Sequence, residues 1–170
     1  MKKTSISIHY CRAIGLAALV ASITAAPAAT VTTTFQVTAS VAAQCSVTAA
    51  DLAFGAVNPL GGNVDQTSTV TVKCTKDSAY TVGLNAGTTT GSTIAARLMA
   101  NGANTMQYQL YSDNLRSTIW GNSSGSWVSG TGAGMGTGQS LIVYGRIPSG
   151  QTNLAVGSYS EPTITVTITY

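Results

Sequence analysis

Apolar and polar side chains largely alternate between residues 30 and 41 of this chain. One face of this segment carries Val31, Thr33, Phe35, Val37, Ala39 and Val41, and the intervening positions are Thr, Gln and Ser. Because successive side chains of a β-strand point to opposite faces, a period of two is typical of an extended segment. The pattern predicts a long arm with one mostly apolar face.

The same period of two returns several times beyond the arm, and turn residues separate the runs. It predicts strands at residues 45–48, 66–74, 80–84, 106–111, 141–147 and 164–170. Glycine and serine dominate residues 121–138, which predicts a loop, since glycine loses much backbone entropy in a regular element. With no helical period anywhere, we expect an all-β fold, most simply a β-sandwich of immunoglobulin-like character, with a closed barrel as the alternative.

The composition supports strands over helices. Only 8% of the residues are charged, against about 25% in a typical soluble protein, and Thr, Ser, Gly, Ala and Val fill the difference. Thr and Val are β-branched and suit a pleated surface, whereas an exposed helix normally carries Glu, Lys, Arg and Gln. We therefore expect no substantial helix in the fold.

The first residues have the composition of a secretory signal peptide. Lys2, Lys3 and Arg12 precede an apolar run over residues 13–23, and small residues follow at 25–29. This arrangement predicts a signal peptide over residues 1–28, with cleavage after Ala28. The alternative, a membrane anchor, is disfavoured because the apolar run is shorter than the roughly 20 residues that span a bilayer. We expect no membrane span in the mature chain.

Removal of the signal peptide changes the charge and the available chemistry. Taking 28 residues from 170 leaves a mature chain of 142 residues. Its five basic residues equal its five acidic residues in number, so the formal net charge falls from +3 to about zero. A nucleic-acid partner is not expected for such a balance. His9 is lost as well, so the mature chain has no histidine to serve as a catalytic base. With only scattered carboxylates remaining, we expect no enzyme and no cofactor.

Two cysteines, Cys45 and Cys74, remain in the mature chain. Because the exported chain reaches an oxidising compartment, a single disulfide between them is expected. Two sulfurs without a histidine do not complete a zinc tetrahedron, so a metal site is the weaker interpretation. Of the two tryptophans, Trp120 follows an apolar neighbour and is expected in the core, whereas Trp127 is left open, since an exposed ring could stack on a sugar.

Several sequence blocks resemble a known family. They are Cys45 with residues 51–55, and then residues 70–74, 108–113, 119–121, 144–148 and 157–159. In order and spacing the chain resembles the spore coat protein U domain over nearly all of its mature length. Within that family it looks most like the shaft subunits of archaic, Csu-type chaperone-usher pili.

The resemblance implies an incomplete immunoglobulin-like sandwich that lacks its final strand. A periplasmic chaperone would fill the resulting groove first, and the arm of the next subunit would fill it later. We therefore expect a signal peptide at residues 1–28, a donor-strand arm at 29–41 and a sandwich domain at 42–170. The apolar arm face defined above would enter the groove, although the pattern leaves open which residue occupies which pocket.

The implied partners are identical or related pilin subunits joined head to tail, the periplasmic chaperone and an outer-membrane usher. The protein would be exported through the periplasm to the cell surface, where the pilus supports adhesion and biofilm formation. A secreted carbohydrate- or surface-binding module, or a tip adhesin, is the alternative function. Tip subunits are expected to carry an additional receptor domain, for which 142 residues leave no space.

Overall fold

The computed structural model describes residues 26–170, so the predicted signal peptide lies almost wholly outside the described residues. The chain divides into two units, of which the described parts are residues 26–39 and residues 40–170. Residues 26–39 are exposed throughout and belong to no strand or helix. The second unit contains eight strands in two antiparallel sheets.

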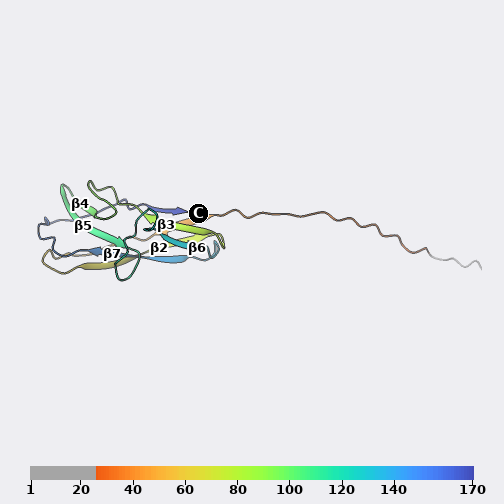
Figure 1. Ribbon diagram of the computed structural model, residues 1–170, viewed down its shortest axis with the longest axis horizontal. Coiled ribbons are helices and arrows are strands. Elements are labelled where there is room, and N and C mark those ends of the chain that lie inside the picture. Colours follow the sequence, from red (N-terminus) through yellow and green to blue (C-terminus); the bar gives the residue numbers. More distant parts are fainter. Residues whose placement is uncertain (1–25) are drawn as a thin grey trace, which may run out of the picture. The chain divides into compact units, whose positions relative to one another are not determined.

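The two sheets are assembled from strands that are distant in the sequence (Figure 1). In order across the larger sheet lie β1 (Cys45–Ala49), β2 (Val64–Cys74), β7 (Gln139–Ile147), β5 (Asn104–Tyr111) and β4 (Arg97–Asn101). The smaller sheet contains β6 (Val128–Thr131), β3 (Ala79–Leu84) and β8 (Val166–Thr169), in that order. Because β1 and β8 end their respective sheets, each has one edge without a strand partner among the described residues.

The core takes alternate side chains from both sheets. Its buried apolar residues include Val70, Val72 and Cys74 of β2, Tyr80, Val82 and Leu84 of β3, and Met106, Tyr108 and Leu110 of β5. Trp120 is fully buried among them, and its indole Nε1–H donates a hydrogen bond of 2.8 Å to the carbonyl of Val82. The prediction that Trp120 belongs to the core is confirmed.

A disulfide joins Cys45 to Cys74 across the first pair of strands. The two residues face each other in the β1–β2 register, which continues to the pair Ala49 and Val70. The expected cross-link is therefore present, and it ties the edge strand β1 to its neighbour β2 in the larger sheet.

The predicted all-β sandwich is confirmed, and residues 26–170 contain no helix. Two strands, β4 and β6, were not predicted. β6 lies inside residues 121–138, which the glycine content had marked as a loop. A glycine is required in this strand because of packing. Gly130 pairs with Tyr80, and a Cβ atom at Gly130 would collide with the Tyr80 ring. Glycine here allows a close approach between strands.

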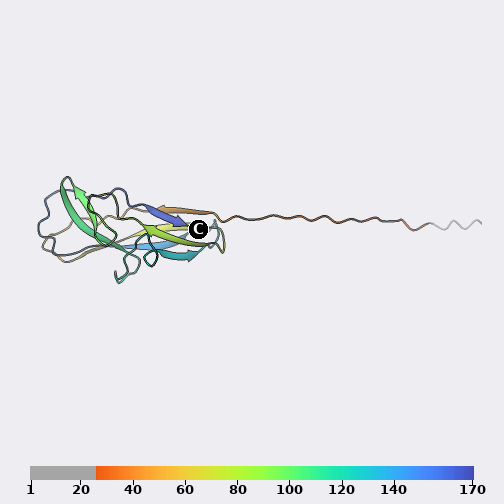
Figure 2. The same cartoon turned by 45° about the horizontal axis from the view of Figure 1, so that its top comes forward.

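The last strand is shorter than the predicted residues 164–170. Ahead of β8, the amide of Thr165 donates to the side-chain oxygen Oδ1 of Asn85, at 2.8 Å, instead of joining a regular ladder. β1 and β8 lie side by side in Figure 2, where β1 is orange and β8 dark blue. Within the described residues, no helix has the length and apolarity required to cross a membrane.

Candidate binding groove

An open groove lies between the segment that follows β1 and the segment that leads into β8. Its first rim is formed by residues between 49 and 59, which follow β1, and its second rim by residues between 154 and 166, which lead into β8. The cavity has a volume of about 1070 Å³. The floor comes from both sheets and includes Ser68, Val70, Leu84, Met99, Met106, Tyr108, Leu110, Val143 and Ile147.

The first rim continues the direction of β1 along β2. The amide of Ala50 donates to the carbonyl of Thr69 at 3.0 Å, and the Ser68 hydroxyl donates to the carbonyl of Ala50 at 2.6 Å. Leu52 and Phe54 are half-buried and pack against the core from this rim. The rim is thus held on its inner side by backbone contacts, while its apolar side chains border the groove.

The second rim is anchored at its middle and at its C-terminal end. Ser160 forms an isolated antiparallel bridge with Ala100 of β4, and Val166 pairs with Leu84 of β3. The chain therefore crosses from the outer edge of the larger sheet to the smaller sheet. Ile164 and Val166 are half-buried here and pack against the core.

Glu161 fastens the middle of the second rim. Its carboxylate accepts hydrogen bonds from the backbone amides and hydroxyls of Thr88, Thr89 and Thr163, at 2.7–3.3 Å. Burial alone would raise the pKa of Glu161, but the hydrogen bonds from Thr89 and Thr163 outweigh it and hold the pKa at about 2. The carboxylate is therefore charged at neutral pH and ties the rim to residues 88 and 89.

A buried cation bridges the two sheets beneath the groove. Arg97 of β4 is fully buried, and its guanidinium donates to the carbonyls of Leu84, Asn85 and Trp120 and to the side-chain oxygen of Gln109, at 2.6–3.1 Å. Burial lowers the pKa of Arg97 to about 10, which leaves the group charged at neutral pH. All four partners are neutral oxygen atoms and none is a carboxylate. Hydrogen bonds to neutral groups, rather than an ion pair, therefore stabilise this charge.

Tyr108 lies beside Arg97 on the groove floor, because the two residues are directly paired between β4 and β5. The ring of Phe54, from the first rim, meets the Tyr108 ring edge-on with 6.3 Å between centroids. Burial raises the pKa of Tyr108 to about 12, so its hydroxyl keeps its proton. That hydroxyl is buried and has no hydrogen-bond partner in the described part of the chain.

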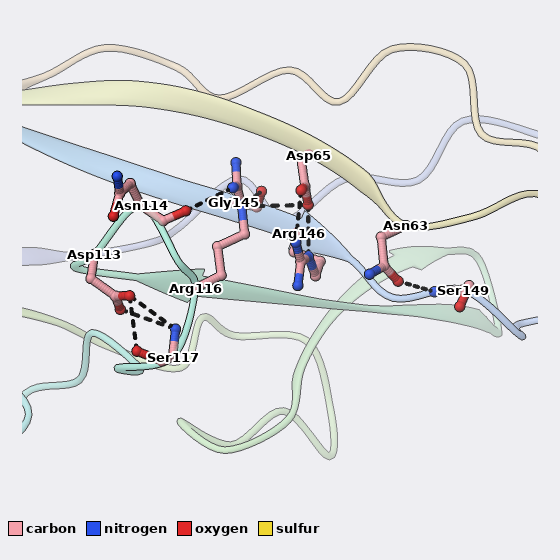
Figure 3. A network of polar contacts seen from close by, with 9 residues as sticks. All are labelled: Asn63, Asp65, Asp113, Asn114, Arg116, Ser117, Gly145, Arg146 and Ser149. Atoms are coloured by element: carbon pink, nitrogen blue, oxygen red, sulfur yellow. Dashed lines mark hydrogen bonds and ion pairs between the residues drawn. The ribbon is translucent and has the colours of Figure 1, made fainter.

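A second polar cluster lies away from the groove (Figure 3). Asp65 accepts two hydrogen bonds of 2.7 Å from Arg146, and Arg116 approaches the same carboxylate at 3.4 Å. The hydrogen bond from Arg146 is the main reason why the pKa of Asp65 is lowered. None of these residues lines the groove. Because the carboxylate and both guanidinium groups are partly exposed, the cluster contributes little stability.

The predicted arm residues are placed outside any strand. Val31 is 97% exposed and Phe35 86% exposed, and Thr33, Val37, Ala39 and Val41 are exposed as well. Their predicted insertion into a neighbour stays a prediction.

Trp127, whose place in the core or on the surface the sequence left open, is 40% exposed. Between residues 26 and 170, no group of three or more His, Cys, Asp or Glu side chains could hold a metal ion.

Three features of the groove were missed by the sequence reasoning. The sequence indicates Glu161 only as one of five scattered acids, Arg97 only as one of five basic residues, and Tyr108 only as part of the block at residues 108–113. The role of each residue depends on partners that are distant in the sequence; Arg97, for example, donates a hydrogen bond to the carbonyl of Trp120. The sequence gives one indication that Arg97 is buried: it stands directly before apolar residues in the strand sequence RLMAN.

Fold and groove together define a β-sandwich with an open groove between the segments that follow β1 and precede β8. The family model of the Spore Coat Protein U domain matches residues 31–169, and the chain belongs to this family, as the sequence blocks predicted. Protein U of Myxococcus xanthus is 35% identical to this chain over 174 residues, which cover 93% of this chain and 95% of that protein.

A solved structure shares the fold. It is a chain in the crystal structure of the CsuC-CsuE chaperone-tip adhesion subunit pre-assembly complex, from archaic chaperone-usher Csu pili of Acinetobacter baumannii. The TM-score is 0.56 at 20% identity, and the match covers 76% of this chain and 40% of that chain. This chain therefore spans less than half the length of its structural neighbour, and the likeness supports the sandwich fold.

Proposed function

We propose that this protein is an exported structural subunit of a chaperone-usher pilus, and that it polymerises head to tail by donor-strand exchange. The observation that carries this proposal is the apolar groove between the segment that follows β1 and the segment that leads into β8, two strands that each end a sheet. Residues 1–28 are removed on export, the arm at 29–41 leaves its own subunit, and residues 42–170 form the receiving sandwich. The product is a surface fibre that supports adhesion and biofilm formation.

The chemistry of the groove suits an extended peptide strand. An edge strand presents unpaired backbone N–H and C=O groups, and an added strand satisfies them while its alternate side chains fill the pockets below. The floor is largely apolar, with Val70, Met106 and Leu110 along its length. No hydrolytic chemistry is needed for such a function, since the interaction is one of pairing and burial.

The arm has the length and the pattern of the missing strand. Its thirteen residues would extend over about 43 Å at about 3.3 Å per residue. Phe35 and Val37 are its best pocket-filling residues, because each large apolar side chain moved from water into a groove contributes about 1.5 to 3 kcal/mol. Their present exposure supports this role.

A groove of this kind must be covered before assembly. Exposed edges and apolar floors promote aggregation, so we propose that a periplasmic chaperone occupies the groove first and that an outer-membrane usher exchanges it for the next subunit's arm. The structural neighbour was crystallised in a chaperone-subunit complex, which supports the same order of events.

The test of this function compares Phe35→Asp with Gln36→Asp. These residues are adjacent in the arm but lie on opposite faces of its alternating pattern. We expect Phe35→Asp to block fibre assembly, because a charge would enter an apolar pocket, and Gln36→Asp to be mild. Each variant is expressed with its chaperone and usher, and unboiled samples are run on a gel. Equal oligomer ladders for wild type and Phe35→Asp would show that the arm is not the donor strand.

A further inference from the structure

The arm joins the domain at a defined set of contacts beside the disulfide. Residues 26–44 belong to no strand, yet Gln44 pairs with Thr75, one position beyond the disulfide pair. The amide of Thr75 donates to the carbonyl of Gln44 at 2.8 Å, and the amide of Gln44 donates to the Thr75 hydroxyl oxygen at 3.0 Å. The carbonyl of Thr75 instead accepts from the amide of Ser78 at 3.1 Å, so the regular pairing ends here. We call Gln44, Cys45, Cys74 and Thr75 the arm anchor.

Two covalent routes lead from the arm anchor into the domain. The first follows β1, which has five residues and whose only partner strand within residues 26–170 is β2, and then enters the first rim of the groove. The second crosses the disulfide to Cys74, at the end of the eleven-residue strand β2. A pull along the first route therefore reaches the groove, whereas a pull along the second reaches β2, which lies between β1 and β7.

The Cys74 end of the second route has contacts with a segment that connects the two sheets. Cys74 is fully buried, and its carbonyl accepts from the amide of Gly134 at 3.0 Å. The amide of Gly132 donates to the carbonyl of Ser78 at 2.8 Å. Both glycines lie between β6 of the smaller sheet and β7 of the larger sheet. A Cβ atom at Gly132 would collide with the carbonyl oxygen of Thr75, so this close approach requires glycine. A force that arrives at Cys74 is thus shared with both sheets.

We propose that, in an assembled fibre, the arm anchor carries tension from the arm across the disulfide into β2 and keeps this tension away from the first rim of the groove. The inference rests on the proposed function, but it requires no particular register of the arm. When each arm is held in a neighbouring subunit, a pull along the fibre enters every domain through residues 42–45, because these residues connect the arm to the domain. A first rim that stays unloaded keeps its own groove closed on the arm of another subunit.

Loss of the disulfide changes the path of the force. The backbone pairing of β1 with β2 then bears the pull, from Ser46 with Lys73 to Ala49 with Val70. Once this pairing breaks, residues 45–63 can pull out as far as the start of β2, and the first rim leaves the groove with them. These nineteen residues add up to about 65 Å of extended chain.

The first experiment stretches single fibres before and after reduction. Fibres of the full mature chain are assembled with chaperone and usher and are pulled in optical tweezers, and alkylation confirms that the thiols are free. We expect reduced fibres to break at a lower force than native fibres, after an extra lengthening of up to about 65 Å per subunit. Without load, the same reduced fibres should stay assembled on unboiled gels.

Two results of this experiment would overturn the proposal. One is an equal breaking force and length for native and reduced fibres, which would show that the disulfide carries no tension. The other is that reduced fibres fall apart without load, which would show that the disulfide serves only the fold of the subunit. If the buried sulfur of Cys74 resists the reductant, fibres of the double variant Cys45→Ala with Cys74→Ala are pulled instead.

The second experiment separates the two parts of the arm anchor. Thr75→Val removes the hydroxyl that holds Gln44 and keeps the disulfide, whereas Thr75→Ser keeps both. In native fibres Thr75→Val should leave the breaking force at the wild-type value, because the tension crosses the disulfide. In reduced fibres it should lower the breaking force further, and Thr75→Ser should not. Thr48→Val, at an exposed position of β1, is the matched control and should behave as wild type in both states. Early breakage of Thr75→Val fibres with an intact disulfide would contradict the proposed path of the force.

The outcome is separable from a failure of the proposed function. If Phe35→Asp fibres assemble normally, the arm is not the donor strand and both ideas fall. If Phe35→Asp blocks assembly while native and reduced fibres break at the same force and length, donor-strand exchange stands. In that case only the role of the arm anchor under tension is wrong.

Discussion

Strand β2 and the arm carry the same alternation of apolar and polar residues, yet they lie in opposite environments. Val72 of β2 is fully buried, whereas Phe35 of the arm is 86% exposed. β2 has a strand on each of its edges, β1 and β7, and the arm belongs to no strand pair. Alternation thus indicates that a segment can form a strand, but the partner decides whether it does.

The two regions should respond differently to substitution. Changes in the domain at 42–170 should lower the stability and yield of the subunit itself. Changes in the arm should leave the subunit intact and act on assembly. The following domain variants sharpen this contrast, and the Phe35→Asp variant described above is its counterpart in the arm.

The largest effect is expected for Cys74→Ala. The disulfide closes a loop with a sequence separation of 29, and on the chain-entropy model its loss costs about 3 to 4 kcal/mol of unfolding free energy. We expect a clear fall in periplasmic yield, measured beside Phe35→Asp, which should keep the wild-type yield. Mass spectrometry of the native wild-type protein should find no alkylatable thiol, and free Cys45 and Cys74 would contradict this account.

Arg97→Met should be the next most damaging change. It removes the guanidinium donor from the carbonyls of Leu84, Asn85 and Trp120, and we expect a loss of about 2 to 3 kcal/mol. This loss of unfolding free energy is measured by urea unfolding, with the fluorescence of the buried Trp120 as the signal. Arg146→Met is the control, since its exposed pair with Asp65 should contribute less than about 1 kcal/mol. Equal losses for the two variants would mean that Arg97 has no special role.

Glu161→Gln should have a smaller effect that depends on pH. The pKa of Glu161 is lowered from an ordinary 4.5 to about 2, so its carboxylate stabilises the fold above pH 4.5. That contribution is lost as the pH falls from about 4.5 toward 2. We expect Glu161→Gln to cost about 1 to 2 kcal/mol at pH 7. Urea unfolding at several pH values measures the difference in unfolding free energy between wild type and Glu161→Gln, which should shrink below pH 4.5. A difference that does not change with pH would contradict a stabilising role of the Glu161 carboxylate.

The sequence predicts those parts of the fold that depend on local pattern. Alternation located strands such as β2 and β7 to within a few residues, and two cysteines in a chain predicted to be exported indicated their disulfide. The predicted loop at residues 121–138 hid β6, because the pairing of Gly130 with Tyr80 depends on a contact across 50 positions. Residue type alone could not reveal it.

The groove was expected only through the family resemblance, and its polar details were not. Arg97 is stabilised by carbonyls at positions 84, 85 and 120, which no spacing rule connects. Glu161 likewise gains its hydrogen bonds from Thr88 and Thr89, more than 70 residues away. Such sites arise where distant segments meet, and the sequence pattern of either segment alone does not indicate them.

The central claim is that the arm of one subunit supplies the strand that another subunit lacks. The most direct test deletes residues 29–41, isolates the shortened subunit with its chaperone, and adds a synthetic peptide of residues 29–41. Native mass spectrometry should show a folded, disulfide-bonded subunit that exchanges the chaperone for one peptide, while a peptide with Phe35→Asp is not taken up. A shortened subunit that does not fold, or one that never binds the wild-type peptide, would show that the arm is an integral strand or has another role.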